Sequence, residues 1–423
     1  MVHDLEWGLA RRIVFRFAFV FGALLVFPFP LDMIPPAGPL VAVLMKPLTW
    51  SVVWFVDVLG LPQPVPGPNG SGDRAFDYAG TLLFVIAAAI AAIVWSVIDR
   101  RRRAYPRLAT AAWIVLRYYV AAVMFSYGVS KVLKLQFYDL SPGVLHQRIG
   151  DTPPMRLMWA FMGYSQPYTV FSGLAEVIGG ALLLWRRTVM LGALLVIAVM
   201  TNVVMLNLCY DVPVKLFSTQ LLVMTLLIAL PGAKRLFGAA LGRAVAELPP
   251  RPRGSSRRER ARLIVKLVFV ASLGYWICVP YAKRPSHDDH RHELYGNWIV
   301  DRFVRNGVEH PPLTTDPVRW ESWSASPAYM QIWRMNGTVE GRTDYERGWY
   351  DINVDPTAKT ITVVIDDKQK TKEVWTYVRP APDQLVIDGV HRGATLHLAL
   401  HREPDGVLVT RGFHWYNEMP FNR

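Results

Sequence analysis

Three ionisable side chains lie inside long apolar stretches of the sequence, where charged residues are rare. Arg117 and Lys131 belong to the apolar run at residues 111–133, and Glu176 is the acid of the run at 168–185. An ionised group in lipid hydrocarbon costs several kcal/mol unless it is paired or reaches water. These residues are therefore candidate catalytic groups that could move protons or polarise a ligand. A structural ion pair between helices is the alternative, and the sequence leaves both open.

The spacing of these residues indicates how helices would place them. Arg117 and Lys131 are 14 residues apart, which is about four helical turns, so both fall on nearly the same helix face. Gly128 lies between them and would let another helix or a ligand approach closely. We expect Glu176 at a depth between the two cations, so that either could be its partner. Lys134 is predicted to be an interface anchor.

Further polar and aromatic residues could complete a binding site. Asn202 and Asn207 lie in the apolar run at 188–208, whereas Asp211 and Lys215 are predicted to be structural groups at the rim. The aromatic residues predicted to line a pocket are Tyr118, Tyr119, Tyr127, Trp159, Phe161 and Tyr164. The predicted ligand contacts are Tyr127, Gly128, Tyr164, Asn202 and Asn207.

The elements that carry these residues are predicted to be membrane-spanning helices. The 423-residue chain is 52% hydrophobic, and its apolar residues crowd into residues 13–281, whereas 282–423 resembles a soluble domain. A span needs about 20 mostly apolar residues. Seven stretches come close: 13–31, 78–98, 111–133, 168–185, 188–208, 215–231 and 263–281. The stretch 39–61 is predicted to be an interfacial pair of helices broken at Lys46-Pro47.

The positions of the basic residues predict the orientation. With the N-terminus in the cytoplasm, 18 basic residues fall on the cytoplasmic side and 6 in the outer loops before the last domain. This asymmetry is typical of multi-pass proteins of a bacterial inner membrane. The C-terminal domain would then be periplasmic. The net charge of +13 lies in clusters between apolar runs, so no nucleic-acid partner is predicted.

The predicted organisation has six parts. They are N-terminal spans at 1–110, a four-helix core at 111–232, a basic cytoplasmic linker at 233–262, the last span at 263–281, a second linker at 282–292 and a β-barrel domain at 293–423. No metal site is predicted, and the tract His287–Glu293 is interpreted as a solvated linker. Cys209 and Cys278 both lie near the outer face, which would allow a disulfide.

The last domain shows short runs of alternating apolar and polar residues separated by turn signals, as in an antiparallel barrel. Gly296-x-Trp298 opens it, and Arg411 lies in the final run, which is predicted to be a strand. This pattern resembles the lipocalins, in which a basic residue of the last strand covers the tryptophan. Such a barrel can hold a small ligand or be filled with side chains.

The helical region resembles the DoxX family of small membrane proteins. The matching parts are Arg117, Gly128-Val129-Ser130-Lys131, and GLAEVIGGALLL with Glu176. The resemblance implies a four-helix core and links to quinone-dependent or other redox processes. The same core is similar to the transmembrane domain related to the vitamin K-dependent carboxylase, in which the lysine matching Lys131 acts on a reduced quinone.

Three functions follow as hypotheses. The first is a membrane protein that handles a quinone or another lipophilic ligand, alone or with membrane redox subunits. The second is a non-enzymatic binder of lipids or lipophiles through the barrel, and the third is an anchor for a partner complex. Membrane lipid is a predicted partner in every case. A quinone is the one cofactor suggested, and whether the chain is an enzyme stays open.

Overall fold

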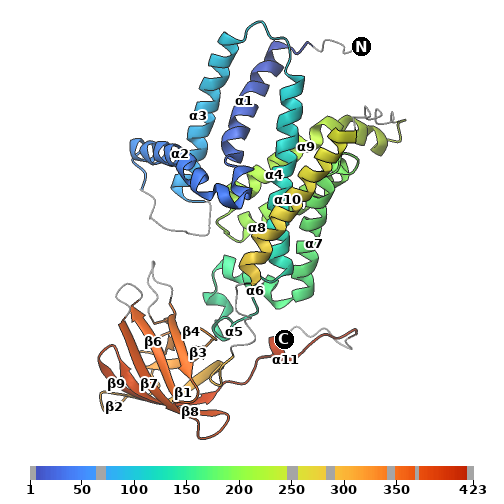
Figure 1. Ribbon diagram of the computed structural model, residues 1–423. Coiled ribbons are helices and arrows are strands. Elements are labelled where there is room, and N and C mark those ends of the chain that lie inside the picture. The colour runs from blue at the N-terminus through green and yellow to red at the C-terminus, as the bar shows by residue number, and fades with distance from the viewer. Residues whose placement is uncertain are drawn as a thin grey trace. The chain divides into compact units, whose positions relative to one another are not determined.

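The computed structural model describes residues 6–62, 73–244, 256–282, 291–340, 348–366 and 371–416. The chain forms two compact units. One unit comprises residues 1–138 and 153–283, and the other comprises 139–152 and 284–423. The first is helical and the second contains all the described strands (Figure 1). Residues 283–290 of the predicted linker at 282–292 and residues 245–255 of the predicted linker at 233–262 lie outside the described residues.

The helical unit contains helices suited to a membrane. Six described helices are long and apolar enough to span one: Leu9–Met33 (α1, Leu9–Val26, with the turn and the 3-10 helix Leu31–Met33 that follow it), Gly38–Val58 (α2), Ala75–Ile98 (α3), Pro106–Val132 (α4), Val189–Cys209 (α8) and Lys215–Ala240 (α9). Large apolar side chains of α3 such as Ile90 and Ile93 are exposed. Such a surface suits lipid rather than water, so the chain is a multi-pass membrane protein.

Two predicted spans are not among these six. The stretch 168–185 forms α7 (Gln166–Leu183), which begins with polar residues and carries Glu176. The stretch 263–281 lies in α10 (Ser256–Ala282), whose described apolar part is Leu263–Tyr275. The remaining helix of this unit, α6 (Pro154–Tyr164), packs against α7.

The stretch 39–61 differs from its prediction. It is one continuous helix, α2, with Pro47 inside it, so the expected break at Lys46-Pro47 is wrong. Proline removes one backbone donor and bends a helix, but apolar membrane helices tolerate it. Figure 1 shows α2 lying across α3 rather than along it. The side chains of Trp50 and Trp54 on α2 are exposed.

The centre of the helical unit is a closed four-helix bundle. Helix α4 packs on α7, α7 on α8, α8 on α9, and α9 returns to α4. The core between them consists of Val120, Ala121, Met124, Leu183, Val196, Met200, Leu221, Met224 and Ile228 with their neighbours. Helix α1 packs mainly on α3 beside this bundle. The bundle therefore fixes α4 and α7, the two helices that carry the candidate site.

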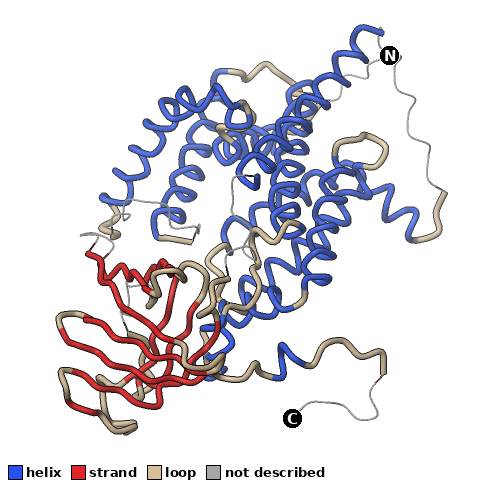
Figure 2. Tube along the Cα trace, turned by 60° about the horizontal axis from the view of Figure 1, so that its bottom comes forward, coloured by secondary structure: helices blue, strands red, loops and turns tan. Residues whose placement is uncertain are grey.

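The second unit is an antiparallel β-barrel (Figure 2). Its strands follow one another in chain order, and the last pairs with the first, which closes the barrel. The eight barrel strands are β1 (Gly296–Arg305), β3 (Trp320–Ala325), β4 (Tyr329–Arg334), β5 (Tyr350–Asp355), β6 (Thr360–Asp366), β7 (Thr371–Val378), β8 (Gln384–His391) and β9 (Ala394–Arg402). The two-residue β2 (Val308–Glu309) pairs only with β1.

The interior of the barrel is filled with side chains. Leu396, Leu398 and Leu400 of β9 point inward, and His397 and His401 face outward. The core also contains Trp298, Phe303, Trp320, Trp323, Trp375, Tyr350 and Tyr377. Of the two alternatives for the barrel, this core favours the side-chain-filled one.

The end of the barrel domain corrects the sequence analysis. Residues 407–410 form the short helix α11 (Val407–Thr410) instead of a strand, because β9 already closes the barrel at Arg402. Strand β3 was not predicted. Its sequence does not alternate simply, since a bulge between Trp320 and Ser322 lets both Trp320 and Trp323 point inward.

The segment 139–152, with α5 (Pro142–His146), packs on the outside of the barrel. His146 Nδ1 lies 2.9 Å from Glu403 Oε2, and its Nε2 lies 2.7 Å from Ser322 Oγ. A serine, a histidine and a carboxylate in this order also occur in hydrolase triads. Ser322, however, is 0% exposed, so the contacts fasten the segment to the barrel.

Replacing His146 with alanine should loosen this segment. The loss of both hydrogen bonds costs about 1–3 kcal/mol, so we expect cleavage by trypsin after the exposed Arg148 to accelerate about tenfold or more. The matched control is His397→Ala, which removes an outward histidine paired with Asp388. Equal cleavage rates for the wild type and His146→Ala would contradict the assignment.

Candidate functional site

The site begins where α4 and α7 touch through glycines. A Cβ on Gly128 would lie 2.6 Å from the carbonyl oxygen of Gly173, and a Cβ on Gly173 would lie 2.6 Å from that of Gly128. Nearer the other end of α7, Gly180 faces Met124. The facing residue numbers run in opposite directions, so the helices are antiparallel. Without side chains at these glycines, the backbones approach closely enough to hold neighbouring polar groups together.

Lys131 and Glu176 form a buried ion pair at this contact. Lys131 Nζ donates a hydrogen bond to Glu176 Oε1 at 2.5 Å. Lys131 is 6% exposed and Glu176 is 2% exposed. The separation of 45 residues is bridged because each charged residue lies against the glycine of the other helix: Lys131 packs on Gly173, and Glu176 packs on Gly128. The structure therefore brings together two of the three predicted catalytic residues.

One oxygen of this pair is unused. Glu176 Oε2 is buried and has no hydrogen-bond partner. A buried acceptor without a donor costs about 1–3 kcal/mol, and buried polar atoms in native proteins are nearly always satisfied. The ring of Tyr127 lies near the pair, with Lys131 Nζ 5.9 Å from its centroid. The arrangement can therefore accept one further donor group beside a fixed positive charge.

Arg117 lies elsewhere, which corrects the expectation that it could share Glu176. Its Nε and Nη2 donate to the carbonyl oxygen of Leu183 at 3.0 and 2.5 Å, and its guanidinium lies 4.5 Å from the ring centroid of Trp113. Leu183 is the last residue of α7, where carbonyl groups lack helical partners and cations are favoured. Arg117 therefore caps α7, about 21 Å along α4 from Lys131 at 1.5 Å per residue.

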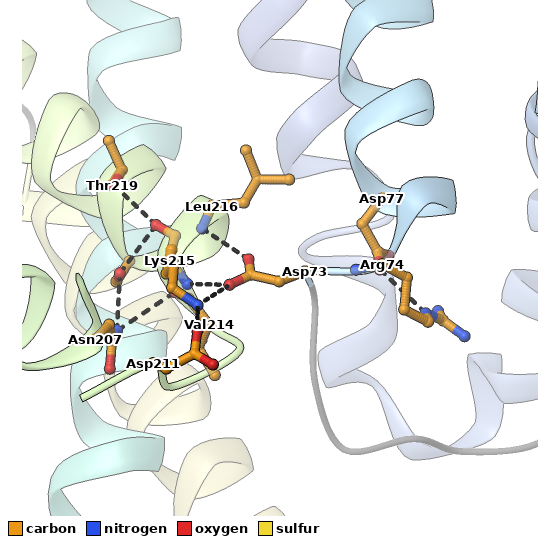
Figure 3. A network of polar contacts seen from close by, with 10 residues as sticks. Asp73, Arg74, Asp77, Asn207, Asp211, Val214, Lys215, Leu216 and Thr219 are labelled. Carbon is orange, nitrogen blue, oxygen red and sulfur yellow. Dashed lines mark hydrogen bonds and ion pairs between the residues drawn. The ribbon is translucent and has the colours of Figure 1, made fainter. Parts of the chain in front are cut away.

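Asn207 belongs to a different polar network, shown in Figure 3. Its Nδ2 donates to Ser218 Oγ at 3.0 Å across the turn between α8 and α9. In the same region Asp73 accepts hydrogen bonds from the backbone N–H groups of Lys215 and Leu216, and Lys215 Nζ pairs with Asp211 at 2.8 Å. Asp73 thus satisfies two donors at the start of α9, a structural task.

The other predicted contacts are dispersed. Asn202 is exposed on α8, and Tyr164 is exposed at the end of α6. Tyr118 packs against Phe269 and Tyr119 against Phe29. Trp159 packs against Phe137, and Phe161 packs against Tyr168. The candidate site therefore comprises Lys131, Glu176, Tyr127 and the two contacting glycines.

A further buried cation, Arg16, was missed by the sequence analysis. Arg16 of α1 is 2% exposed and donates to the hydroxyl of Tyr105, to Ser96 Oγ and to the carbonyl oxygen of Asp99. These partners are neutral oxygens, and through Ser96 and Asp99 Arg16 links α1 to the end of α3. Its burial could have been predicted, because Arg16 is a charged residue inside the apolar run at 13–31.

Two of the three residues of the predicted barrel signature lie on β1, and the third lies beyond the last strand. Trp298 is fully buried in the core, and Arg379 lies over its ring with 5.8 Å between guanidinium and centroid. On the last strand, Arg402 pairs in register with Trp298 and lies beside Gly296. Arg411 follows α11, beyond the last strand, and is therefore not the residue that the lipocalin pattern calls for.

The barrel contains a buried ionisable cluster of its own. His391 lies between two carboxylates, 2.7 Å from Glu340 Oε1 and 3.1 Å from Glu373 Oε2. Burial alone would raise the pKa of Glu340, but the His391 hydrogen bond and the nearby Arg334 and Arg392 charges hold that pKa below its usual value. The ring of His391 packs against Trp320, Trp375 and Tyr350, so the cluster completes the core.

Metal and thiol chemistry have little support in the described ranges. Within them no group of three or more His, Cys, Asp or Glu side chains is arranged to hold a metal ion. The tract His287–Glu293 falls largely outside the described residues. Cys209 is an exposed free cysteine, and the side chain of Cys278 is not described.

The helices and the barrel define a class: a polytopic membrane protein with a C-terminal antiparallel β-barrel. The chain is 33% identical over 122 residues to the uncharacterised protein YwoB of Bacillus subtilis (strain 168). That match covers 29% of this chain and 77% of YwoB. The chain therefore belongs to the same family as YwoB. No protein-family model matches it, and no solved structure matches it.

Proposed function

We propose that the helical bundle binds a lipophilic ligand bearing a hydroxyl or carbonyl group, of which a quinone is the leading candidate, at Lys131 and Glu176. The observation that carries the proposal is the buried, unpartnered Oε2 of Glu176 beside the Lys131 ammonium. Ionisable groups within a membrane are by default candidates for function. A ligand hydroxyl would supply the donor that this oxygen lacks.

The pair suits proton transfer to or from such a ligand. Glu176 can accept a proton from a ligand hydroxyl, and Lys131 can donate a hydrogen bond to a ligand carbonyl. Tyr127 offers an aromatic face beside the ammonium. In a redox process the electrons of the ligand would pass to or from a membrane redox partner. The resemblance of the same residues to the DoxX family supports a role in such a redox process.

We further propose that the protein is in a bacterial inner membrane, with its N-terminus cytoplasmic and the barrel periplasmic. The charge asymmetry of 18 basic residues against 6, counted with α7 and α10 as spans and with α2 lying at the membrane surface, supports this orientation. Lys131 lies near the C-terminal end of α4, so the site would lie in the outer half of the bilayer. The filled barrel interior gives no support to a ligand carried inside the barrel.

Lipid extraction tests the binding proposal. The wild type and the double variant Lys131→Met/Glu176→Gln would be purified from the same membranes, and quinones and other bound lipophiles would be quantified by mass spectrometry. The double variant removes both charges, so neither is left unpaired in the bundle. We expect its bound lipophile to fall about tenfold or more, a loss of at least ~1.4 kcal/mol.

Lys134→Met is the matched control for this experiment. It also exchanges a lysine for methionine in the same part of the chain but spares the buried pair, and we expect it to retain the wild-type ligand content. The proposal fails if the double variant folds and carries as much lipophile as the wild type.

A further inference from the structure

The segment after the last barrel strand exposes a dense set of large apolar side chains. Phe413 is 79% exposed, Trp415 is 91% exposed and Tyr416 is 78% exposed. In the preceding helix α11, Val407, Leu408 and Val409 are all exposed as well. Six of the ten residues at 407–416 are thus large, apolar or aromatic, and exposed.

This segment differs from the rest of the barrel surface. Exposed apolar residues on the strands, such as Val374, Val378 and Val390, occur singly at outward-facing positions. Single exposed apolar residues are normal in soluble domains, whereas contiguous ones mark a site of interaction with another protein or with a membrane. A contiguous exposed set of this kind is typical of a surface that contacts another protein or a membrane.

We propose that residues 407–416 dock on the lipid–water interface of the bilayer that holds the helical unit. Trp and Tyr are enriched at this interface because they combine an apolar body with a polar group. The sequence VLVTRGFHWY contains Arg411 and no carboxylate. A segment of this charge is complementary to phosphate head groups and to anionic lipid.

The chain connection makes the bilayer the nearest partner available. Helix α10 ends at Ala282 and β1 begins at Gly296, which leaves 13 residues between them. At about 3.3–3.6 Å per residue these can reach at most ~45 Å. A weakly binding segment tethered this closely meets the membrane surface at a high effective concentration, so few aromatic contacts are enough to hold the barrel at the interface.

Accessibility of a spin label tests the proposal in the full chain. In a Cys209→Ser/Cys278→Ser background, a nitroxide would be attached at Trp415→Cys or, to leave every aromatic residue in place, at Val409→Cys. The matched control label is at Val308→Cys, an exposed apolar position of β2. The protein would be placed in nanodiscs of phosphatidylethanolamine and phosphatidylglycerol.

We expect labels at 409 and 415 to be more accessible to oxygen, which concentrates in lipid, than to a water-soluble nickel chelate. The label at 308 should show the opposite preference. The proposal is overturned if 409 and 415 behave as 308 does, which means a hydrated segment. It is equally overturned if both reagents are excluded there, which means that the segment docks on protein, either this chain or a second copy.

Discussion

Replacing Lys131 with methionine is expected to destabilise the helical unit by about 3 kcal/mol, because it leaves the Glu176 carboxyl buried without its partner. Glu176→Gln should be destabilising for the complementary reason, since Lys131 would then keep an uncompensated charge. The double variant should be much closer to the wild type than the sum of the two single variants. A double-mutant cycle, measured by unfolding in mixed micelles with increasing SDS, gives this coupling directly.

The double-mutant cycle shows whether Lys131 and Glu176 interact or contribute to stability independently. Lys134→Met serves as the control, and combining it with Glu176→Gln should give additive effects within about 0.5 kcal/mol. Additive effects of Lys131→Met and Glu176→Gln would show that the contact at 2.5 Å does not form in the membrane. The cycle measures stability only, so its result does not depend on which ligand is bound.

Gly128→Ala is expected to push α4 and α7 apart and to cost about 3 kcal/mol or more. The added methyl group would lie 2.6 Å from the backbone oxygen of Gly173 and 2.8 Å from Val177 Cγ2. A backbone carbonyl cannot move away as a flexible side chain can, and overpacking of a close contact costs about 1–3 kcal/mol even where side chains yield. The same shift would separate Lys131 from Glu176, so the bound lipophile should be lost too.

Gly22→Ala is the matched control for this prediction. Gly22 also lies in the middle of a helix, α1, but a Cβ there meets nothing within 4 Å. We expect that substitution to be neutral or to stabilise by up to ~1 kcal/mol, since alanine is the better helix former. If Gly128→Ala melts at the same temperature as Gly22→Ala in detergent, the close contact between the helices is wrong.

The sequence showed which charged residues of the site would be buried, but not which of them would form an ion pair with each other. The burial of Lys131 and Glu176 could be foreseen, because charges in apolar runs must be hidden or paired. Which cation would meet Glu176 depends on the register between two antiparallel helices separated by a long connection. The Gly128–Gly173 contact sets that register, and no local pattern in the sequence reports it. For this reason the sequence left Arg117 and Lys131 both open as partners of Glu176, whereas Arg117 caps α7.

In the barrel, too, local features could be predicted from the sequence, whereas contacts between distant segments could not. Alternation of apolar and polar residues predicted strands in this domain, because period two is a local property of a strand. The bulge in β3 hid that strand, and the basic cover of Trp298 comes from Arg379, which only the closed barrel brings to the tryptophan. The final run 406–416 was interpreted as a strand from its composition. It lies outside the closed barrel because β1 and β9 already satisfy each other's backbone groups.

The central claim is that Glu176 receives a hydrogen bond or a proton from a lipophilic ligand. Infrared difference spectroscopy of the purified full chain, before and after addition of decylubiquinol, observes the carboxyl group directly. We predict a ligand-induced change in the carboxyl region that is present in the wild type and in Lys134→Met and absent in Glu176→Gln. A spectrum in which Glu176→Gln shows the same change as the wild type, or in which the wild type shows none, would contradict the account.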